Sequence, residues 1–468
     1  MTARIKSTVR TLLMAVVGII VLRGALLGVP ALTDPTESRY AMISCQMAES
    51  GDWITPRLWL KGDLVPYWGK PPLHFWLAAA SFKAFGISTA AARLPAFLTG
   101  LATIALTGWL GMRLWGAAAG ATAALILASA AFFYPALGAS IIDMTLTLAV
   151  TGAVVGCAAA VKLRSRGWGL ACFAFLAAGF MTKGPVALVL AGLPVLGWAA
   201  VTGRWRDLDR LPWAAGSAVF LVLVVPWFLA AERATRGFLA YFFINENFLR
   251  FVSRSYGDLY GAGHAYPYGT IWPVLVVGFL PWTVPLVGKA WQHARAIRRD
   301  SGLVLALCWG LSAAILFTFG RQWLPAYILP ALPGLALATA RLVRPRSRVL
   351  IAWAFLVPVL ACAVVPARAL IDDQRSCRAV IGMISEIPDA RGMRIAFHGI
   401  VPHSAQFYGT AAGLTVDPAP LDETALARTV PGRIVVVADP RGRLPASLRR
   451  RLRAAAIVAT GRWAACRW

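Results

Sequence analysis

The sequence predicts an all-α polytopic membrane protein with about 11 to 13 transmembrane helices and a small C-terminal α/β domain. Of its 468 residues, 59% are hydrophobic and only 14% are charged, which is less charge than a soluble protein of this length carries. Gly, Pro and Trp are frequent, at 42, 29 and 19 residues, as in membrane helices and their interfaces. Long apolar runs recur up to about residue 370, where the composition changes.

About eleven apolar runs are long enough to cross a bilayer. We expect them near 11–32, 93–112, 116–135, 143–161, 167–182, 184–202, 211–231, 268–288, 302–319, 323–343 and 348–367. The run at 167–182 is short and abuts the next, so the count is open by about two. The first run is too long for a signal peptide and has no clear cleavage site, so we interpret it as a retained helix.

Basic residues gather in every other loop, which fixes the predicted orientation. They are Arg113; Lys162, Arg164 and Arg166; Arg204, Arg206 and Arg210; Lys289, Arg295, Arg298 and Arg299; and Arg341, Arg344, Arg346 and Arg348. Cytoplasmic loops carry such an excess, so the N-terminus is expected in the cytoplasm and the C-terminus in the periplasm. The net charge of +26 then indicates anionic lipid rather than nucleic acid.

The predicted domains are a transmembrane domain at 1–370, with long periplasmic loops at 33–92 and 232–267, and a small periplasmic α/β domain at 371–468. Loops of this length are usually functional. In the first loop, "ESRYAMISCQMAES" places Tyr40, Ile43 and Met47 on one face of an amphipathic surface helix, and "KPPLHFWLAAASFKAFG" indicates a second. In the tail, "RIAFHGI" and "RIVVVADP" are typical of buried strands and "LPASLRRRLRAAA" of a helix.

The predicted topology brings polar side chains to the periplasmic edge of the membrane. They are Asp34, Glu37, Arg39, Lys70, Asp143, Lys183, Glu246, Arg250, Arg254, His264, Arg321 and Tyr327. Charges beside hydrocarbon are costly, so a group of them at one edge is a functional hypothesis. Carboxylates can act as a general base, and Lys and Arg can hold a phosphate. A phosphate at the membrane surface indicates a lipid phosphate.

Each of these residues also has a structural interpretation. Asp34 and Glu37 could cap a surface helix, and Asp143 could cap its own helix. Lys70 and Lys183 could extend to the interface. Arg250, Arg254, His264 and Arg321 could anchor loops there, and Tyr327 could belong to an aromatic belt.

The segment "ESRYAMISCQMAESGDWITPRLWLKGDLVPYWGKPPLHFWL" resembles the first outer loop of the lipid-phosphate-dependent glycosyltransferases with the C-type membrane fold (GT-C). The most similar group is the superfamily of lipid A aminoarabinose transferases and protein mannosyltransferases. The later segments "IIDMTLTL", "MTKGP", "VPWF", "FFINENFLRF", "LPW" and "YILPALPGLAL" follow in the family's order, so the resemblance covers roughly residues 10–345. Thr36 stands where the family usually has Asp, and Gly69 where it often has Glu.

The resemblance implies a multi-pass enzyme of the bacterial inner membrane with a periplasmic active site. It would move a sugar from a polyprenyl-phosphate donor, undecaprenyl phosphate in a bacterium, to lipid A or lipopolysaccharide, a protein or a glycan. The transfer would invert the anomeric carbon and need no metal or cofactor, since Gly69 removes the acid that would complete a metal site. A monomer without nucleic acid is expected.

The resemblance also implies roles for single residues. Lys70, Lys183 and one or more of Arg250, Arg254 and Arg321 would bind the phosphate, with Tyr327 beside it. Arg39, Tyr40 and His264 would contact substrate. Because of Thr36, the base could be Glu37 or Asp34, with Asp143 in reserve.

Two other classes of function remain open from the residues. A transporter or flippase of a lipid-linked sugar would also need a cavity with cations, but it should carry charges near the membrane midplane. A membrane assembly protein would explain the tail and not the first loop.

Overall fold

The computed structural model describes residues 3–253, 258–260, 264–293, 297, 299–343, 347–421, 433–438, 446, 448, 450, 456–460 and 463–467. These residues form two compact units. Unit 1 comprises 1–25, 68–74 and 96–362, and unit 2 comprises 26–67, 75–95 and 363–468. The boundary at residue 370 stays a prediction. Most of the first long loop, within residues 26–67 and 75–95, belongs to the same compact unit as the C-terminal part of the chain.

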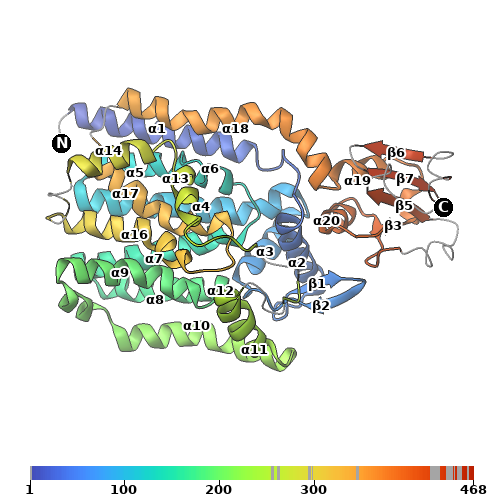
Figure 1. The fold of residues 1–468 in the computed structure, drawn as a ribbon, viewed down its shortest axis with the longest axis horizontal. Coiled ribbons are helices and arrows are strands. Elements are labelled where there is room, and N and C mark those ends of the chain that lie inside the picture. Colours follow the sequence, from blue (N-terminus) through green and yellow to red (C-terminus); the bar gives the residue numbers. More distant parts are fainter. Residues whose placement is uncertain are drawn as a thin grey trace. The chain divides into compact units, whose positions relative to one another are not determined.

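Unit 1 is a bundle of helices (Figure 1). Its elements are α1 (Ala3–Ala25), α4 (Thr89–Trp115), α5 (Ala117–Ala128), α6 (Phe133–Ala136), α7 (Ile142–Leu163), α8 (Arg166–Lys183), α9 (Val186–Thr202), α10 (Trp213–Ala234), α11 (Phe238–Ala240), a π-helical segment (Tyr241–Leu249), α12 (Arg250–Val252), α13 (Ile271–Gly278), α14 (Thr283–Gln292), α16 (Ser301–Thr318), α17 (Leu332–Leu342) and α18 (Ser347–Arg375). Two 3-10 segments, Trp205–Arg210 and Pro325–Ala331, join them. Both α4 and α18 continue into unit 2.

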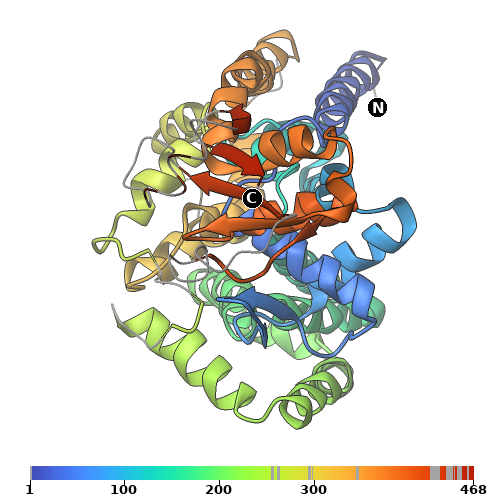
Figure 2. The same cartoon turned by 90° about the vertical axis from the view of Figure 1, so that its right-hand side faces the viewer.

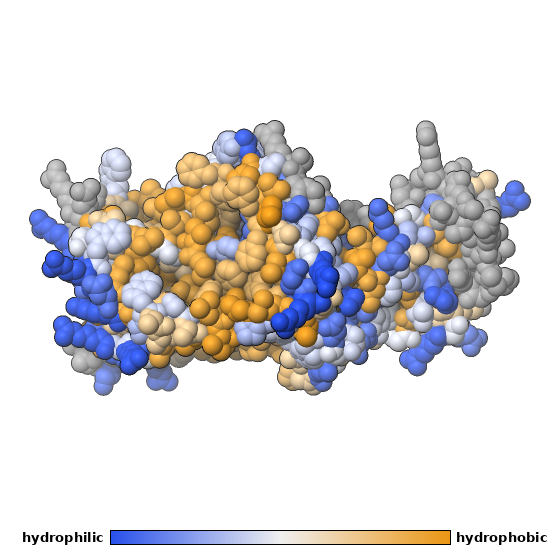
Figure 3. All heavy atoms as spheres, turned by 90° about the horizontal axis from the view of Figure 1, so that it is seen from below, coloured by the Kyte–Doolittle hydropathy of each residue, from blue (hydrophilic) through white to orange (hydrophobic). Residues whose placement is uncertain are grey.

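Several of these helices have the length and composition of membrane spans. In the described part of the chain they are Ile5–Ala25, Thr89–Trp115, Ile142–Leu163, Trp213–Ala234 and Ser301–Thr318. The pair α13 and α14, bent by 101°, adds a sixth if it counts as one span. The other predicted runs coincide with shorter apolar helices such as α5 and α9, so the count of 11 to 13 stays a prediction. Figure 3 shows a broad band of hydrophobic side chains on the surface of this bundle.

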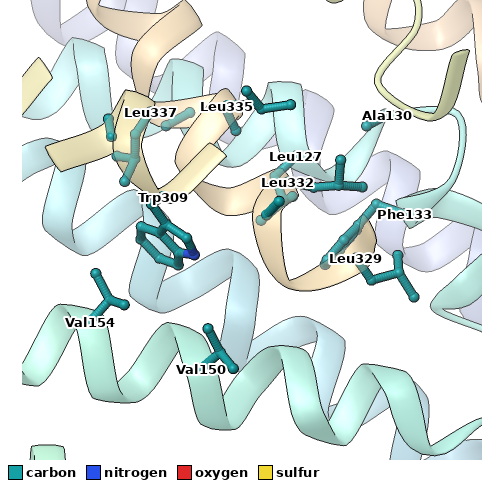
Figure 4. Close-up of a cluster of buried hydrophobic side chains, with 14 of the residues drawn as sticks. Leu127, Ala130, Phe133, Val150, Val154, Trp309, Leu329, Leu332, Leu335 and Leu337 are labelled. Carbon is teal, nitrogen blue, oxygen red and sulfur yellow. The ribbon is translucent and has the colours of Figure 1, made fainter. Parts of the chain in front are cut away.

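The core of unit 1 forms where α5, α7, α16 and α17 pack together. Trp309 lies in it beside Val150, Val154 and Leu335 (Figure 4), and its indole nitrogen donates to the carbonyl of Pro330 at 2.7 Å. Helices α16 and α17 approach closely because Gly334 has no side chain. A Cβ there would lie 2.5 Å from the backbone nitrogen of Gly310.

Unit 2 contains the first long loop and the tail (Figure 2). Its elements are α2 (Thr36–Ser50), β1 (Arg57–Leu60), β2 (Asp63–Pro66), α3 (Leu73–Phe85), α19 (Arg378–Ser385), β3 (Arg394–His398), α20 (His403–Ala411), β4 (Thr415–Val416), β5 (Arg433–Ala438), β6 (Ala456–Thr460) and β7 (Trp463–Arg467). Strands β1 and β2 form an antiparallel hairpin.

The second sheet has the strand order β4-β3-β5-β7-β6. Strand β3 is parallel to β4 and β5, whereas β7 is antiparallel to β5 and β6. Strands β3 and β5 lie on the two segments that the sequence predicts as strands. The predicted helix at "LPASLRRRLRAAA" falls largely outside the described residues. Both predicted loop helices are present as α2 and α3, and α2 packs against α20 and β1.

Candidate active site

A cavity of about 260 Å³ in unit 1 gathers three of the five cations that the sequence predicts as phosphate ligands: Lys70, Lys183 and Arg250. Its polar lining includes Lys70, Lys183, Glu246, Arg250 and Tyr327. The rest is largely apolar and comes from α9, the π-helical segment and α16, with Val186, Val189, Phe242, Leu316 and Phe317. We call it the donor cavity. It offers charge at one part of its wall and hydrocarbon at another.

Glu246 holds two of the cations in place. Its carboxylate accepts from the Lys70 ammonium, and its Oε1 lies 2.5 Å from the Arg250 guanidinium. Lys70 also donates to the carbonyl of Gly69 at 2.5 Å. Burial lowers the pKa of Lys70; Glu246 opposes this shift and Arg250 adds to it. A further anion in the cavity would therefore stabilise the charged form of Lys70.

The π-helical segment Tyr241–Leu249 positions this group. It carries Phe242, Glu246 and Asn247 of the lining and passes directly into Arg250. Segments of π-helix are rare and frequently occur at functional sites. Gly184 follows Lys183 with φ of 74°, and a Cβ there would lie 2.6 Å from the Phe242 ring. A glycine thus lets the end of α8 approach the π-helical segment.

The third cation, Lys183, is held by an acid and an aromatic ring. Asp143 at the start of α7 lies 2.5 Å from the Lys183 ammonium, and both side chains are 7% exposed. The ammonium also lies 3.6 Å from the centroid of the Tyr327 ring, a cation–π contact. Three cations therefore face two carboxylates around the donor cavity, which leaves one positive charge in excess among these residues.

The acids of "TDPTESRY" lie in unit 2 and have contacts there. Glu37 pairs with Arg93 at 3.1 Å, and its side chain is 13% exposed. Asp34 accepts from Ser38 at 2.5 Å and from the Ser404 backbone nitrogen at 3.1 Å, so it holds the first turn of α20. These contacts are structural in kind. The role of Glu37 or Asp34 as the base stays a prediction.

Four other predicted site residues, Arg39, Tyr40, His264 and Arg321, are not among the described residues of this lining. In unit 2, the positive charge of Arg39 helps burial to lower the pKa of His403. The centroids of the Tyr40 and Phe75 rings lie 5.7 Å apart. The Arg321 guanidinium lies over the Tyr268 ring at 3.9 Å. His264 accepts from the Trp323 backbone nitrogen through its carbonyl. Neither Arg321 nor His264 is among the described residues of the cavity lining. Arg254 lies outside the described residues.

Glu246 is the residue whose importance the sequence did not reveal. The predicted topology puts it at the periplasmic edge without assigning it a role. Its position four residues before Arg250 was the available signal, because side chains at that spacing meet on a helix. Its contact with Lys70, which is distant in sequence, has no such signal.

The described residues contain no group of three or more His, Cys, Asp or Glu that could hold a metal ion. The metal-free site stays a prediction.

Comparisons with known proteins concern the family and the fold of the chain. The model of the dolichyl-phosphate-mannose-protein mannosyltransferase family matches residues 69–229, which begin at the Gly-Lys-Pro-Pro turn. The chain is 32% identical over 320 residues to an undecaprenyl phosphate-alpha-4-amino-4-deoxy-L-arabinose arabinosyl transferase of Edwardsiella ictaluri, over 66% of this chain and 55% of that protein. It is 30% identical over 350 residues to the enzyme of that name from Enterobacter sp. strain 638, over 72% of this chain and 60% of that protein. The chain thus spans little more than half the length of these relatives.

A solved structure covers nearly the whole chain. The crystal structure of ArnT from Cupriavidus metallidurans bound to undecaprenyl phosphate is similar with a TM-score of 0.78 and 23% identity, over 97% of both chains. At this identity the likeness shows the fold. Together with the family match and the curated relatives, it shows that the chain belongs to the superfamily of lipid-phosphate-dependent membrane glycosyltransferases with the C-type fold.

Proposed function

We propose that this protein is a multi-pass glycosyltransferase of the bacterial inner membrane that moves a sugar from a polyprenyl-phosphate donor to an envelope acceptor. The observation that carries the proposal is the donor cavity, with Lys70, Lys183 and Arg250 beside an apolar wall. The relatives' names support an undecaprenyl phosphate that carries 4-amino-4-deoxy-L-arabinose as the donor, and the family resemblance makes lipid A one expected acceptor.

The charge balance of the cavity fits this donor. A sugar phosphodiester carries one negative charge, which matches the single excess positive charge. When the bond between the anomeric carbon and the phosphate oxygen breaks, the departing polyprenyl phosphate gains negative charge. The cations therefore stabilise the transition state more than the bound donor, which is the requirement for catalysis. They supply this stabilisation without a metal ion.

The acceptor oxygen attacks the anomeric carbon from the face opposite the phosphate, so the transfer inverts that carbon. A carboxylate takes the proton that the acceptor loses. Glu37, Asp34 and Asp143 are the candidates. Glu37 and Asp34 have structural partners in unit 2, and Asp143 is paired with Lys183, so each substitution needs a stability measurement beside the activity.

The test is transfer by the purified full chain from an undecaprenyl-phosphate sugar to lipid A, followed by mass spectrometry of the lipid product. We expect a new glycosidic bond. Movement of the donor across a vesicle membrane without product would instead favour a flippase.

The same assay assigns the base. Of Glu37→Gln, Asp34→Asn and Asp143→Asn, one should lower turnover by roughly a hundred- to ten-thousandfold, with its melting temperature near that of the wild type. The other two should change stability more than turnover. Near-normal turnover in all three would contradict carboxylate catalysis by these residues.

A further inference from the structure

A second and larger cavity of unit 1, of about 760 Å³, lies among helix ends that belong to the predicted cytoplasmic loops. Its rim carries six basic side chains: Lys162, Arg164, Arg204, Arg210, Arg299 and Arg341. We call it the basic cavity. Its volume is in the range of binding sites for small molecules and cofactors, roughly 300–1,000 Å³. The ends of α9, α16 and α17 meet at the end of the bundle that carries the N-terminus (Figure 1), where hydrophilic side chains gather (Figure 3).

The basic cavity and the donor cavity lie at opposite ends of the same helix. Val186, the first residue of α9, lines the donor cavity, whereas Trp198 near its other end lines the basic cavity. A helix of this length spans about 25 Å, which is close to the thickness of the hydrocarbon core. A ligand of the basic cavity would therefore lie in the leaflet away from the donor phosphate.

The acids in the basic cavity are already paired with cations of the rim. Asp207 lies 3.2 Å from Arg210 and 3.9 Å from Arg204. Asp300 lies 2.6 Å from Arg341 and also accepts from the Trp115 indole at 3.1 Å. Six basic and two acidic side chains leave an excess of four positive charges at this rim.

Three cations are left for a ligand. In the part of the chain that the structure describes, no carboxylate lies within ion-pair distance of Lys162, Arg164 or Arg299. All three line the basic cavity and are exposed. A phosphate, with several acceptor oxygens, is the anion that such a set binds best.

The inner wall of the basic cavity is apolar. It is formed by Val154 and Ala158 of α7, Val195 of α9 and Leu305 of α16. A soluble phosphate would use the rim alone. A phosphate that carries a hydrocarbon chain would use both the rim and the wall.

Arg164 adds an independent observation. It ends α7 in the left-handed conformation, with φ of 50°, where glycine is the usual residue and other side chains are strained. The chain thus holds a cation at this rim at some conformational cost. Substitution of Arg164 by glycine would remove the charge, and glycine adopts this left-handed conformation without strain.

We propose that the basic cavity binds the phosphate head group of an anionic phospholipid, with an acyl chain along the wall of Val154, Ala158, Val195 and Leu305. Lys162, Arg164 and Arg299 are its ligands. This site is separate from the donor cavity, and its test reads binding, so its outcome does not depend on sugar transfer.

The experiment is native mass spectrometry of the purified full chain titrated with phosphatidylglycerol, phosphatidylcholine or glycerol 3-phosphate. The test variant is Lys162→Gln/Arg164→Gly/Arg299→Gln. The matched control, Arg113→Gln/Arg166→Gln/Arg206→Gln, removes the same charge from exposed residues that do not line the basic cavity. The control should bind phosphatidylglycerol as the wild type does, and the test variant at least about tenfold more weakly, since it loses three charge-assisted contacts to the phosphate.

Single variants separate the two parts of the site. Arg164→Gly should weaken phosphatidylglycerol binding while its melting temperature stays at or above that of the wild type. Ala158→Phe should weaken phosphatidylglycerol binding, because the larger side chain occupies the space along the apolar wall where the acyl chain would lie. An equal loss in the control variant would reduce the effect to general charge attraction and overturn the proposal. Equal binding of phosphatidylcholine, or of glycerol 3-phosphate, would overturn it as well, the latter in favour of a soluble phosphate.

Discussion

At the scale of single residues, the ion pairs of the donor cavity stabilise the fold and, in our proposal, also hold the cations that bind the donor phosphate. Lys183 and Asp143 are nearly buried and satisfy each other. Removing one member of a buried pair typically costs about 3–5 kcal/mol because the other charge stays behind. A simple loss of activity on mutation would therefore not show that Lys183 touches the donor. Stability and binding have to be measured separately.

A double variant makes this separation. Lys183→Met should lower the melting temperature because Asp143 is left without its cation, and Lys183→Met/Asp143→Asn should recover much of that loss. Binding of undecaprenyl phosphate should stay weak in both variants if Lys183 holds the phosphate. Recovery of binding together with stability would mean that Lys183 is a structural residue.

At the scale of elements, the sequence predicts those helices and strands whose hydrophobic pattern is local to the segment. The apolar runs, the two loop helices and strands β3 and β5 all follow from hydrophobic periodicity. In α2, Ile43 and Met47 of the predicted apolar face are buried in the protein, and Met42 and Cys45 on the remaining surface are buried too. They are covered because α2 packs against β1 and α20, and α20 comes from the far end of the chain.

The π-helical segment could not be predicted. It arises where the backbone hydrogen bonds shift by one residue, and no period in "YFFINENFL" records that shift. The contact between Lys70 and Glu246 could not be predicted either. The two residues are 176 positions apart, so no local pattern pairs them, although both were expected at the same edge of the membrane.

Helix α20 gives unit 2 a predicted dependence on pH. His403 is its first residue, and burial together with Arg39 lowers the pKa of His403 from 6.5 to about 4. Between these pH values the unfolded chain binds the proton and the folded chain does not. Stability should thus be full above pH 6.5 and fall as the pH drops towards 4.

Thermal unfolding from pH 7.5 to 4.5 measures this dependence. The His403→Gln variant should lose less stability over this range than the wild type, whereas replacing the exposed His293 should leave the profile unchanged. Identical profiles for the wild type and His403→Gln would contradict the argument.

At the scale of the whole molecule, the described residues divide into a helical unit and a unit with two sheets. The predicted orientation rests on loop charges, which the fold alone does not reveal. A reporter that is active only outside the cytoplasm should be active when fused after residue 468 and inactive when fused near Arg164 or Arg299. Activity at Arg164 and Arg299 would reverse the orientation, and with it the leaflet assigned to each cavity.

The central claim is that the donor cavity holds a lipid phosphate through its cations. The affinity of the purified full chain for undecaprenyl phosphate tests it most directly, with Arg250→Ala as the test variant and Arg233→Ala, an exposed arginine outside the cavity, as the control. Arg250→Ala leaves Glu246 paired with Lys70, so the fold should survive. We predict that Arg250→Ala binds roughly ten- to a hundredfold more weakly while Arg233→Ala matches the wild type. Wild-type affinity in Arg250→Ala would contradict the claim.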